Sequence, residues 1–122
     1  MNEDAKHLLL VLDDDAAVRD SLKFLLEVEG FKVRTFASPD ELLNDNELPV
    51  SGCLIVDYQM PAMNGLDVVA TLRQRQNTIP AILITAHPDA KIQERASAAG
   101  VTLIKKPFQQ AVLLDCIHQL LS

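Results

Sequence analysis

Polar side chains that could form a charged site follow four separate apolar runs of the sequence. Each comes at the end of its run: Asp13 and Asp14 after residues 8–12, Asp57 after residues 54–56, Thr85 after residues 81–84, and Lys106 after residues 101–104. Carboxylates gather productively around a hard divalent cation, which prefers oxygen ligands. A cation beside a hydroxyl group and an ammonium group is suited to hold a phosphoryl group. The residue types therefore indicate one site for a metal ion and a phosphoryl group.

These polar residues meet in space only if the apolar runs are parallel strands that end at one edge of a sheet. The runs alternate with segments of helical periodicity, which indicates an α/β fold built on a parallel sheet. Such sheets bind ligands in the crevice outside the carboxyl ends of their strands. The expected strands are residues 7–12, 31–36, 52–56, 80–85 and 101–105, and the expected helices are residues 17–29, 39–44, 65–76, 89–99 and 108–121.

The fourth of the expected helices carries the least apolar area on its inward side. Its inward positions at helical spacing are Ile92, Ala96 and Ala99, whereas the first and last helices carry stripes rich in leucine. Because local stability follows buried apolar contact, we expect this helix to be the most weakly held and a place for motion or partner exchange. Close packing through small residues is an equally good interpretation.

The composition favours a single cytoplasmic domain. The 122 residues suffice for one domain, and a net charge of −6 opposes binding to nucleic acid, which needs a basic face. The apolar runs are too short to span a membrane, and the N-terminus lacks the basic start of a signal peptide. We therefore expect no direct contact with nucleic acid or membrane. Cys53 and Cys116 are expected to be buried free thiols without a chemical role.

Four segments of the sequence together carry a specific motif. They are Val11-Leu12-Asp13-Asp14-Asp15 followed by Val18-Arg19, then Asp57-Tyr58-Gln59-Met60-Pro61-Ala62-Met63-Asn64-Gly65, then Thr85-Ala86, and then Lys106-Pro107-Phe108. In this order they resemble the receiver domain of bacterial two-component response regulators, over nearly the whole chain. The resemblance implies a flavodoxin-like (βα)5 fold, in which five parallel strands lie in the order 2-1-3-4-5 with helices on both faces.

The resemblance also implies a phosphorelay function centred on Asp57. A sensor histidine kinase or phosphotransfer protein would pass a phosphoryl group to the Asp57 carboxylate, while Lys106 pairs with one phosphoryl oxygen and the Thr85 hydroxyl donates to another. Such a domain is not an enzyme acting on a separate substrate; it catalyses only its own phosphorylation and dephosphorylation. Its output is a changed protein surface, which contacts a downstream effector or a second copy of the domain. The Lys106-Pro107 bond is cis in this family.

Magnesium, or manganese in its place, is the cofactor that the resemblance implies. Asp14 and Asp57 would bind the ion directly, Asp13 would bind it through water, and the backbone carbonyl of Gln59 would complete the protein ligands. Mg²⁺ usually keeps several waters, so these few ligands suffice. The ion neutralises charge that would otherwise keep a carboxylate and a phosphoryl group apart.

Four neighbouring residues have simpler interpretations. We expect Asp15 to cap the first helix, Lys105 to point into solvent on the opposite face from Lys106, and Tyr58 to point away from the site. His87 is expected to line the mouth of the site rather than to bind the metal, because Mg²⁺ prefers oxygen.

The sequence departs from the family pattern at position 103. The family usually carries an aromatic residue three positions before the site lysine, and its ring turns inward when the threonine moves; here this residue is Leu103. We therefore expect a switch that relies on the fourth helix and the preceding loop rather than on a ring. The domain is expected to occupy residues 1–122 without an effector domain, as a separate receiver or as part of a longer regulator or hybrid kinase.

Two other functions compete with this interpretation. A phosphatase of the haloacid dehalogenase type also uses a strand-end aspartate, a Thr or Ser, a Lys and a metal-binding acid. Its nucleophile comes first and is followed two residues later by a second Asp, whereas here the acidic pair comes first and Gln59 occupies that second position. The other alternative is a receiver-like binding module that works without phosphorylation, which the complete set of site residues disfavours.

Overall fold

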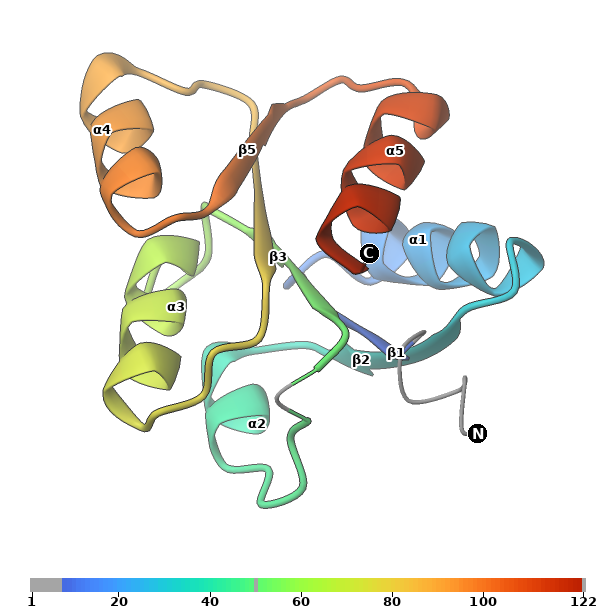
Figure 1. Ribbon diagram of the computed structural model, residues 1–122, viewed down its shortest axis with the longest axis horizontal. Coiled ribbons are helices and arrows are strands. Elements are labelled where there is room, and N and C mark those ends of the chain that lie inside the picture. The colour runs from blue at the N-terminus through green and yellow to red at the C-terminus, as the bar shows by residue number, and fades with distance from the viewer. Residues whose placement is uncertain (1–7, 50, 122) are drawn as a thin grey trace.

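The computed structural model describes residues 8–49 and 51–121. In this part of the chain, five strands alternate with five helices (Figure 1). They are β1 (Leu8–Leu12), α1 (Ala16–Val28), β2 (Lys32–Phe36), α2 (Pro39–Leu43), β3 (Cys53–Asp57), α3 (Gly65–Gln74), β4 (Ala81–Thr85), α4 (Ala90–Ala98), β5 (Thr102–Lys105) and α5 (Gln110–Leu121). The predicted alternation is confirmed, with differences of at most two residues at the ends of the elements. Residue 7, the expected start of the first strand, lies outside the described residues.

The strands form one parallel sheet in the order β2-β1-β3-β4-β5, which confirms the predicted fold class. Leu12 lies opposite Phe36 on one side and Val56 on the other, so β1, β2 and β3 end at the same edge. Asp57 lies opposite Ile84 in the next strand. The carboxyl ends of the strands therefore present their polar residues along a single edge.

Helices cover both faces of the sheet (Figure 1). On one face, buried side chains of β1, β3 and β4 pack with those of α2, α3 and α4: Leu10, Leu54, Leu83, Leu42, Leu66, Leu72 and Ile92. On the other face they pack with α1 and α5: Leu9, Ile55, Ile82, Leu22, Leu26, Leu113 and Ile117. Because both faces are buried, β3 and β4 are continuous apolar runs rather than alternating ones.

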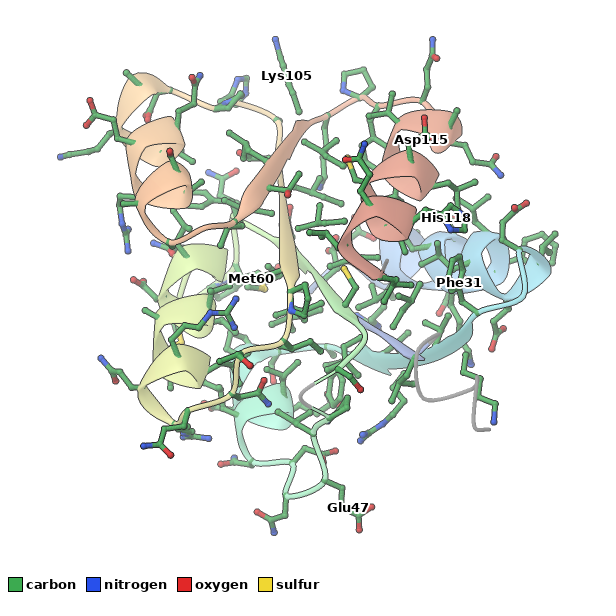
Figure 2. All side chains as sticks on the ribbon, viewed as in Figure 1. Phe31, Glu47, Met60, Lys105, Asp115 and His118 are labelled. Carbon is green, nitrogen blue, oxygen red and sulfur yellow. The ribbon has the colours of Figure 1, made fainter. Side chains whose placement is uncertain are left out.

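The packing of α1 against α5 extends to the start of β2. Phe31, just before β2, lies with its ring centroid 5.7 Å from that of His118 in α5 (Figure 2). Cys53 is buried and Cys116 is half-buried, and both thiols are free, so the expectation of full burial is wrong for Cys116. Burial raises the pKa of Cys53 to about 12, which keeps this thiol protonated.

Helix α4 buries little apolar surface. Its buried residues are Ile92 and Ala96, whereas those of α5 are a leucine and an isoleucine. Ala99, expected to face inward, is exposed because it is the C-cap residue, where the chain leaves the helix. Nη2 of Arg95 forms an exposed ion pair with Oδ1 of Asp67 in α3, at 3.2 Å. Exposed pairs contribute little stability, so α4 is held against the sheet mainly by its two buried side chains.

The start of β3 differs from the prediction at Gly52, which lies outside the strand. The φ of Gly52 is +102°, a left-handed rather than an extended conformation, and an added Cβ would lie 2.2 Å from the Leu8 carbonyl oxygen. A side chain at this position would collide with the start of β1.

Across the described ranges, each helix is too short or too polar to span a membrane.

Candidate functional site

Asp57 is the last residue of β3, and only 8% of its surface is exposed. Its Oδ1 accepts a hydrogen bond from Nζ of Lys106 at 3.0 Å, which also forms an ion pair. Burial raises the pKa of the Asp57 carboxyl above its ordinary value, and the Lys106 ammonium group opposes this shift. A carboxylate with one fixed oxygen and a nearby cation is a suitable group to attack an electrophile.

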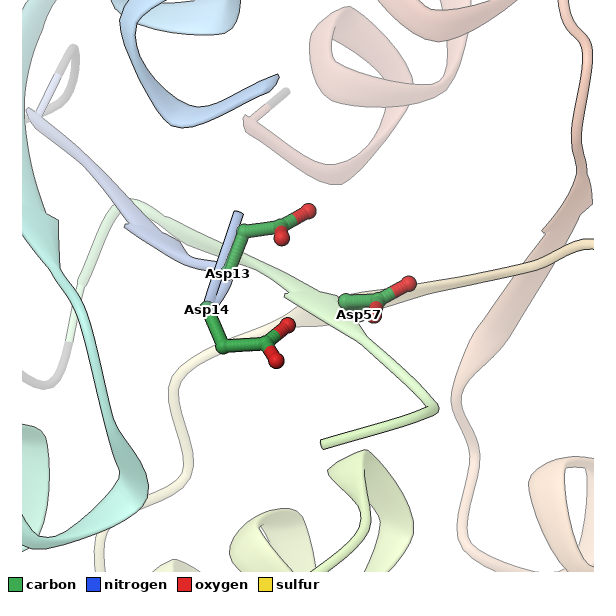
Figure 3. A group of neighbouring side chains, drawn as sticks. All are labelled: Asp13, Asp14 and Asp57. Carbon is green, nitrogen blue, oxygen red and sulfur yellow. The ribbon is translucent and has the colours of Figure 1, made fainter. Parts of the chain in front are cut away.

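Three carboxylates meet at this edge of the sheet. Asp13, Asp14 and Asp57 each offer one oxygen, and these oxygens all lie within 4.8 Å of one another (Figure 3). Asp13 and Asp57 are buried, whereas Asp14 is exposed. Oxygen donors at this spacing fit a hard cation such as Mg²⁺ or Mn²⁺. The structure thus brings together the three carboxylates that the sequence predicts as metal ligands; their binding of an ion remains a prediction.

The turn between β1 and α1 positions the acidic pair. The carboxylate of Asp13 accepts a hydrogen bond from the backbone N–H of Asp15 at 2.9 Å. Asp15 in turn caps α1, because its carboxylate accepts from the N–H groups of Ala17 and Val18. The expected capping role of Asp15 is confirmed. Desolvation by burial raises the pKa of Asp13, and the neighbouring carboxylates of Asp57 and Asp14 add to this effect.

Lys106 reaches Asp57 because of its place after β5. Its backbone N–H donates to the Thr85 carbonyl oxygen at 2.8 Å, which extends the pairing of β4 with β5 by one residue. The preceding residue, Lys105, ends β5 and is exposed (Figure 2). The two lysines therefore have the different environments that alternation along a strand predicts. The Lys106-Pro107 bond is cis, as the resemblance implies.

Thr85, at the end of β4, is buried and hydrogen-bonded to the following loop. Its Oγ1 accepts from the backbone N–H of His87 at 3.3 Å. A recess of about 250 Å³ lies beside it, lined by Tyr58, Gln59, Thr85, His87, Asp89 and Ile92. His87 is exposed and borders this recess, in agreement with its expected place near the mouth of the site. The predicted roles of Thr85 and of the Gln59 carbonyl are untested by these contacts.

Leu103 lies on the face of the sheet that α4 covers. It is opposite Leu83 in the strand register, is half-buried, and packs against the cluster of side chains that includes Ile92. Tyr58 packs against the same cluster. Both residues therefore contact the apolar cluster to which α4 contributes Ile92 and Ala96.

Gly65 is a site-forming residue whose role the sequence does not reveal. A Cβ added there would lie 2.6 Å from the backbone oxygen of Asp57 and 2.7 Å from Cδ1 of Leu83. Its N–H donates to the Tyr58 carbonyl oxygen at 2.9 Å. Only glycine lets α3 begin this close to the end of β3. The glycine of the motif was the available signal, but the close approach depends on the tertiary structure.

We expect Asp13→Asn to stabilise the metal-free protein. Because the pKa of Asp13 is raised above 3.8, the folded state binds a proton here more tightly than the unfolded chain does. The ionised group therefore costs stability at neutral pH, and this cost disappears as the pH falls below the ordinary carboxyl range, about 4. Thermal unfolding in EDTA should give Asp13→Asn the higher midpoint at neutral pH, with the difference shrinking on acidification.

Magnesium should reverse this order. A ligand that binds only the folded state stabilises it by about 2.7 kcal/mol at a hundredfold excess over its Kd, and Asp13→Asn is expected to gain less than the wild type. Asp20→Asn, an exposed change on α1, is the control. A lower unfolding midpoint for Asp13→Asn in EDTA at neutral pH would contradict the prediction.

Several known proteins resemble this chain in sequence and fold. The family model of the response regulator receiver domain matches residues 9–118. The chain is 39% identical to the response regulator protein TodT of Pseudomonas putida over 120 residues. This alignment covers 98% of this chain and 53% of TodT. It is 34% identical over 111 residues to the transcriptional regulatory protein FixJ of Bradyrhizobium diazoefficiens, which covers 90% of this chain and 54% of FixJ.

A solved structure agrees with these relatives. FixJ-N superimposes with a TM-score of 0.84 at 31% identity, covering 94% of this chain and 93% of that chain. The chain spans about half the length of TodT and of FixJ.

Proposed function

Because the chain belongs to the response regulator receiver domains, a family of phosphorelay signalling in two-component systems, we propose that it accepts a phosphoryl group on Asp57 in a Mg²⁺-dependent reaction. The observation that carries this proposal is the convergence of Lys106 and three carboxylates at one edge of the sheet. The expected donor is a phosphohistidine of a sensor kinase or phosphotransfer protein. The modified domain would then bind a downstream effector or a second copy of itself.

The reaction is a transfer of one phosphoryl group between two nucleophiles. An oxygen of Asp57 forms a bond to phosphorus, the bond from phosphorus to the donor nitrogen breaks, and the released imidazole takes up a proton. Bound Mg²⁺ would neutralise charge on the phosphoryl oxygens. The ammonium group of Lys106, which pairs with Asp57 before the reaction, would instead pair with a phosphoryl oxygen as negative charge develops there. A preorganised cation in this position stabilises the transition state.

Access to the site supports a protein donor. A groove of about 320 Å³ runs from Asp13 and Lys106 along α1 to Phe108. Its other lining residues are mostly apolar: Ala17, Val18, Ser21, Leu22 and Ile84. Asp13 and Lys106 of the candidate site therefore border a largely apolar surface groove, which a protein donor could cover.

A small phosphodonor tests the proposal directly. The wild-type chain is incubated with acetyl phosphate in the presence of Mg²⁺ or of EDTA, and its intact mass is measured. We expect an increase of about 80 Da, the mass of one phosphoryl group, with Mg²⁺ only. An unmodified chain under both conditions would overturn the proposal.

We expect phosphorylation to change the loop after β4 and helix α4. The Thr85 hydroxyl can donate to a phosphoryl oxygen, but it now accepts from the N–H of His87. Moving it would disturb this loop, and α4 buries only two of its side chains against the rest of the domain. Hydrogen exchange with and without beryllofluoride should show altered protection across residues 86–100, with residues 16–28 as the internal control. Unchanged protection in residues 86–100 would contradict this output.

Leu103→Tyr is expected to change this response without changing the chemistry. Leu103 packs against the cluster that includes Ile92 and lies opposite Leu83, away from the Asp57–Lys106 pair. A larger ring there should alter the exchange of α4 in the beryllofluoride state, while the rate of phosphorylation by acetyl phosphate stays near that of the wild type. A large loss of rate would show that position 103 acts on the site itself.

A further inference from the structure

Asp13 is held by three hydrogen bonds, one of which comes from a side chain outside the acidic site. Its backbone N–H donates to the Phe36 carbonyl oxygen at 3.3 Å, and its Oδ1 accepts from the N–H of Asp15 at 2.9 Å. Its backbone carbonyl accepts from Nη1 of Arg19 at 2.8 Å. The partners of the first two bonds are backbone groups, so the bond from Arg19 is the one that a substitution can remove.

The bond from Arg19 orients two residues at once. The carbonyl of Asp13 and the N–H of Asp14 belong to a single planar peptide group, so fixing the carbonyl oxygen fixes the whole plane. That plane sets the position of the Asp14 Cα, and with it the direction from which the Asp14 carboxylate approaches the site. Asp14 is exposed, and among the described residues none donates a hydrogen bond to its carboxylate. Its orientation therefore depends on the backbone to which it is attached.

Arg19 is itself anchored to a rigid element. It lies in the second turn of α1, and its backbone N–H donates to the Asp15 carbonyl oxygen at 2.9 Å. Asp15 caps the same helix and donates its own N–H to the Asp13 carboxylate. The turn from Asp13 to Asp15 is thus closed from both sides, by the cap at its end and by the Arg19 side chain across it.

We propose that Arg19 is a positioning residue for the metal site, holding the peptide between Asp13 and Asp14 in the orientation in which both carboxylates face one ion. This inference rests on the proposed Mg²⁺ site and adds a residue that does not touch the ion. Removing a residue that orients a metal ligand typically weakens metal binding by about 10- to 100-fold.

An effect of the Arg19 charge alone would change the Mg²⁺ affinity in the opposite direction, so the two roles can be told apart. A guanidinium group near three carboxylates reduces the negative potential that attracts a cation. If Arg19 acted only through its charge, its removal would tighten Mg²⁺ binding. If it positions the carboxylates, its removal weakens Mg²⁺ binding. The sign of the change therefore separates the two roles.

The test compares Arg19→Met with Lys23→Met in Mg²⁺ titrations of the unphosphorylated protein. Lys23 is exposed one helical turn further along α1, so its replacement removes the same charge without touching Asp13. Tyr58 directly follows Asp57 and is the single tyrosine of a chain without tryptophan, so its fluorescence is the readout for the titrations. We expect Kd for Mg²⁺ to rise roughly tenfold in Arg19→Met, to stay nearly unchanged in Lys23→Met, and to be intermediate in Arg19→Lys.

Circular dichroism checks that each variant is folded. Where Arg19→Met does not fold, Arg19→Gln replaces it with the same expected loss, because its side chain is too short to reach the carbonyl. Wild-type or tighter Mg²⁺ binding by the folded variant overturns the positioning role while the proposed function stands. A wild-type chain that does not bind Mg²⁺ overturns the proposed metal site and this inference together.

Discussion

Replacing Asp57 with asparagine is expected to abolish the uptake of a phosphoryl group. The amide cannot act as a nucleophile at phosphorus, whereas it keeps the size of the side chain and one oxygen. In the wild type, acetyl phosphate and Mg²⁺ should add about 80 Da, and Asp57→Asn should remain at its unmodified mass at every Mg²⁺ concentration. Intact-mass measurement over a time course checks both chains.

Two further variants identify the cause of this loss. Asp14→Ala removes a predicted metal ligand but keeps the nucleophile, so it should need more Mg²⁺ and still form the adduct. Asp115→Asn, an exposed change on α5, should behave as the wild type does. An adduct in Asp57→Asn at the wild-type level would show that another residue accepts the phosphoryl group, and the assignment of Asp57 would be wrong.

The second large effect is expected for Lys106→Ala. Nζ of Lys106 lies 3.0 Å from Oδ1 of Asp57, and no other cation among the described residues forms an ion pair with this carboxylate. Removing a preorganised charge from the site should slow phosphorylation by about 10²-fold. The carboxylates remain, so Mg²⁺ binding measured by tyrosine fluorescence should persist.

The neighbouring lysine provides a matched control for this variant. Lys105→Ala removes an equal charge one residue away, from an exposed side chain that does not pair with Asp57. Its rate of phosphorylation by acetyl phosphate is expected to stay near that of the wild type. Equal rates for Lys106→Ala and Lys105→Ala would refute a specific role of Lys106 in the transfer.

The amino-acid pattern is enough to predict the strands, the helices and the edge of the sheet at which the site forms. Alternating apolar runs and helical stripes indicated the five strands and helices, because the two structures have different periods. The carboxyl ends of parallel strands share one edge, so Asp13, Asp57 and Lys106 were expected together. The order of the strands, by contrast, came from the resemblance to a family, since periodicity does not specify which strands are neighbours.

How these residues are held follows from the packing of the folded chain. It pairs Lys106 with Asp57, buries Asp13 but not Asp14, and ties the Thr85 hydroxyl to the loop before α4. It also places Gly65 against the end of β3 and Arg19 across the turn at Asp13. These contacts join groups from different turns and strands, and their distances follow from how helices pack on the sheet. A local pattern in the sequence carries the residue types, but the directions of individual donors and acceptors are set by that packing.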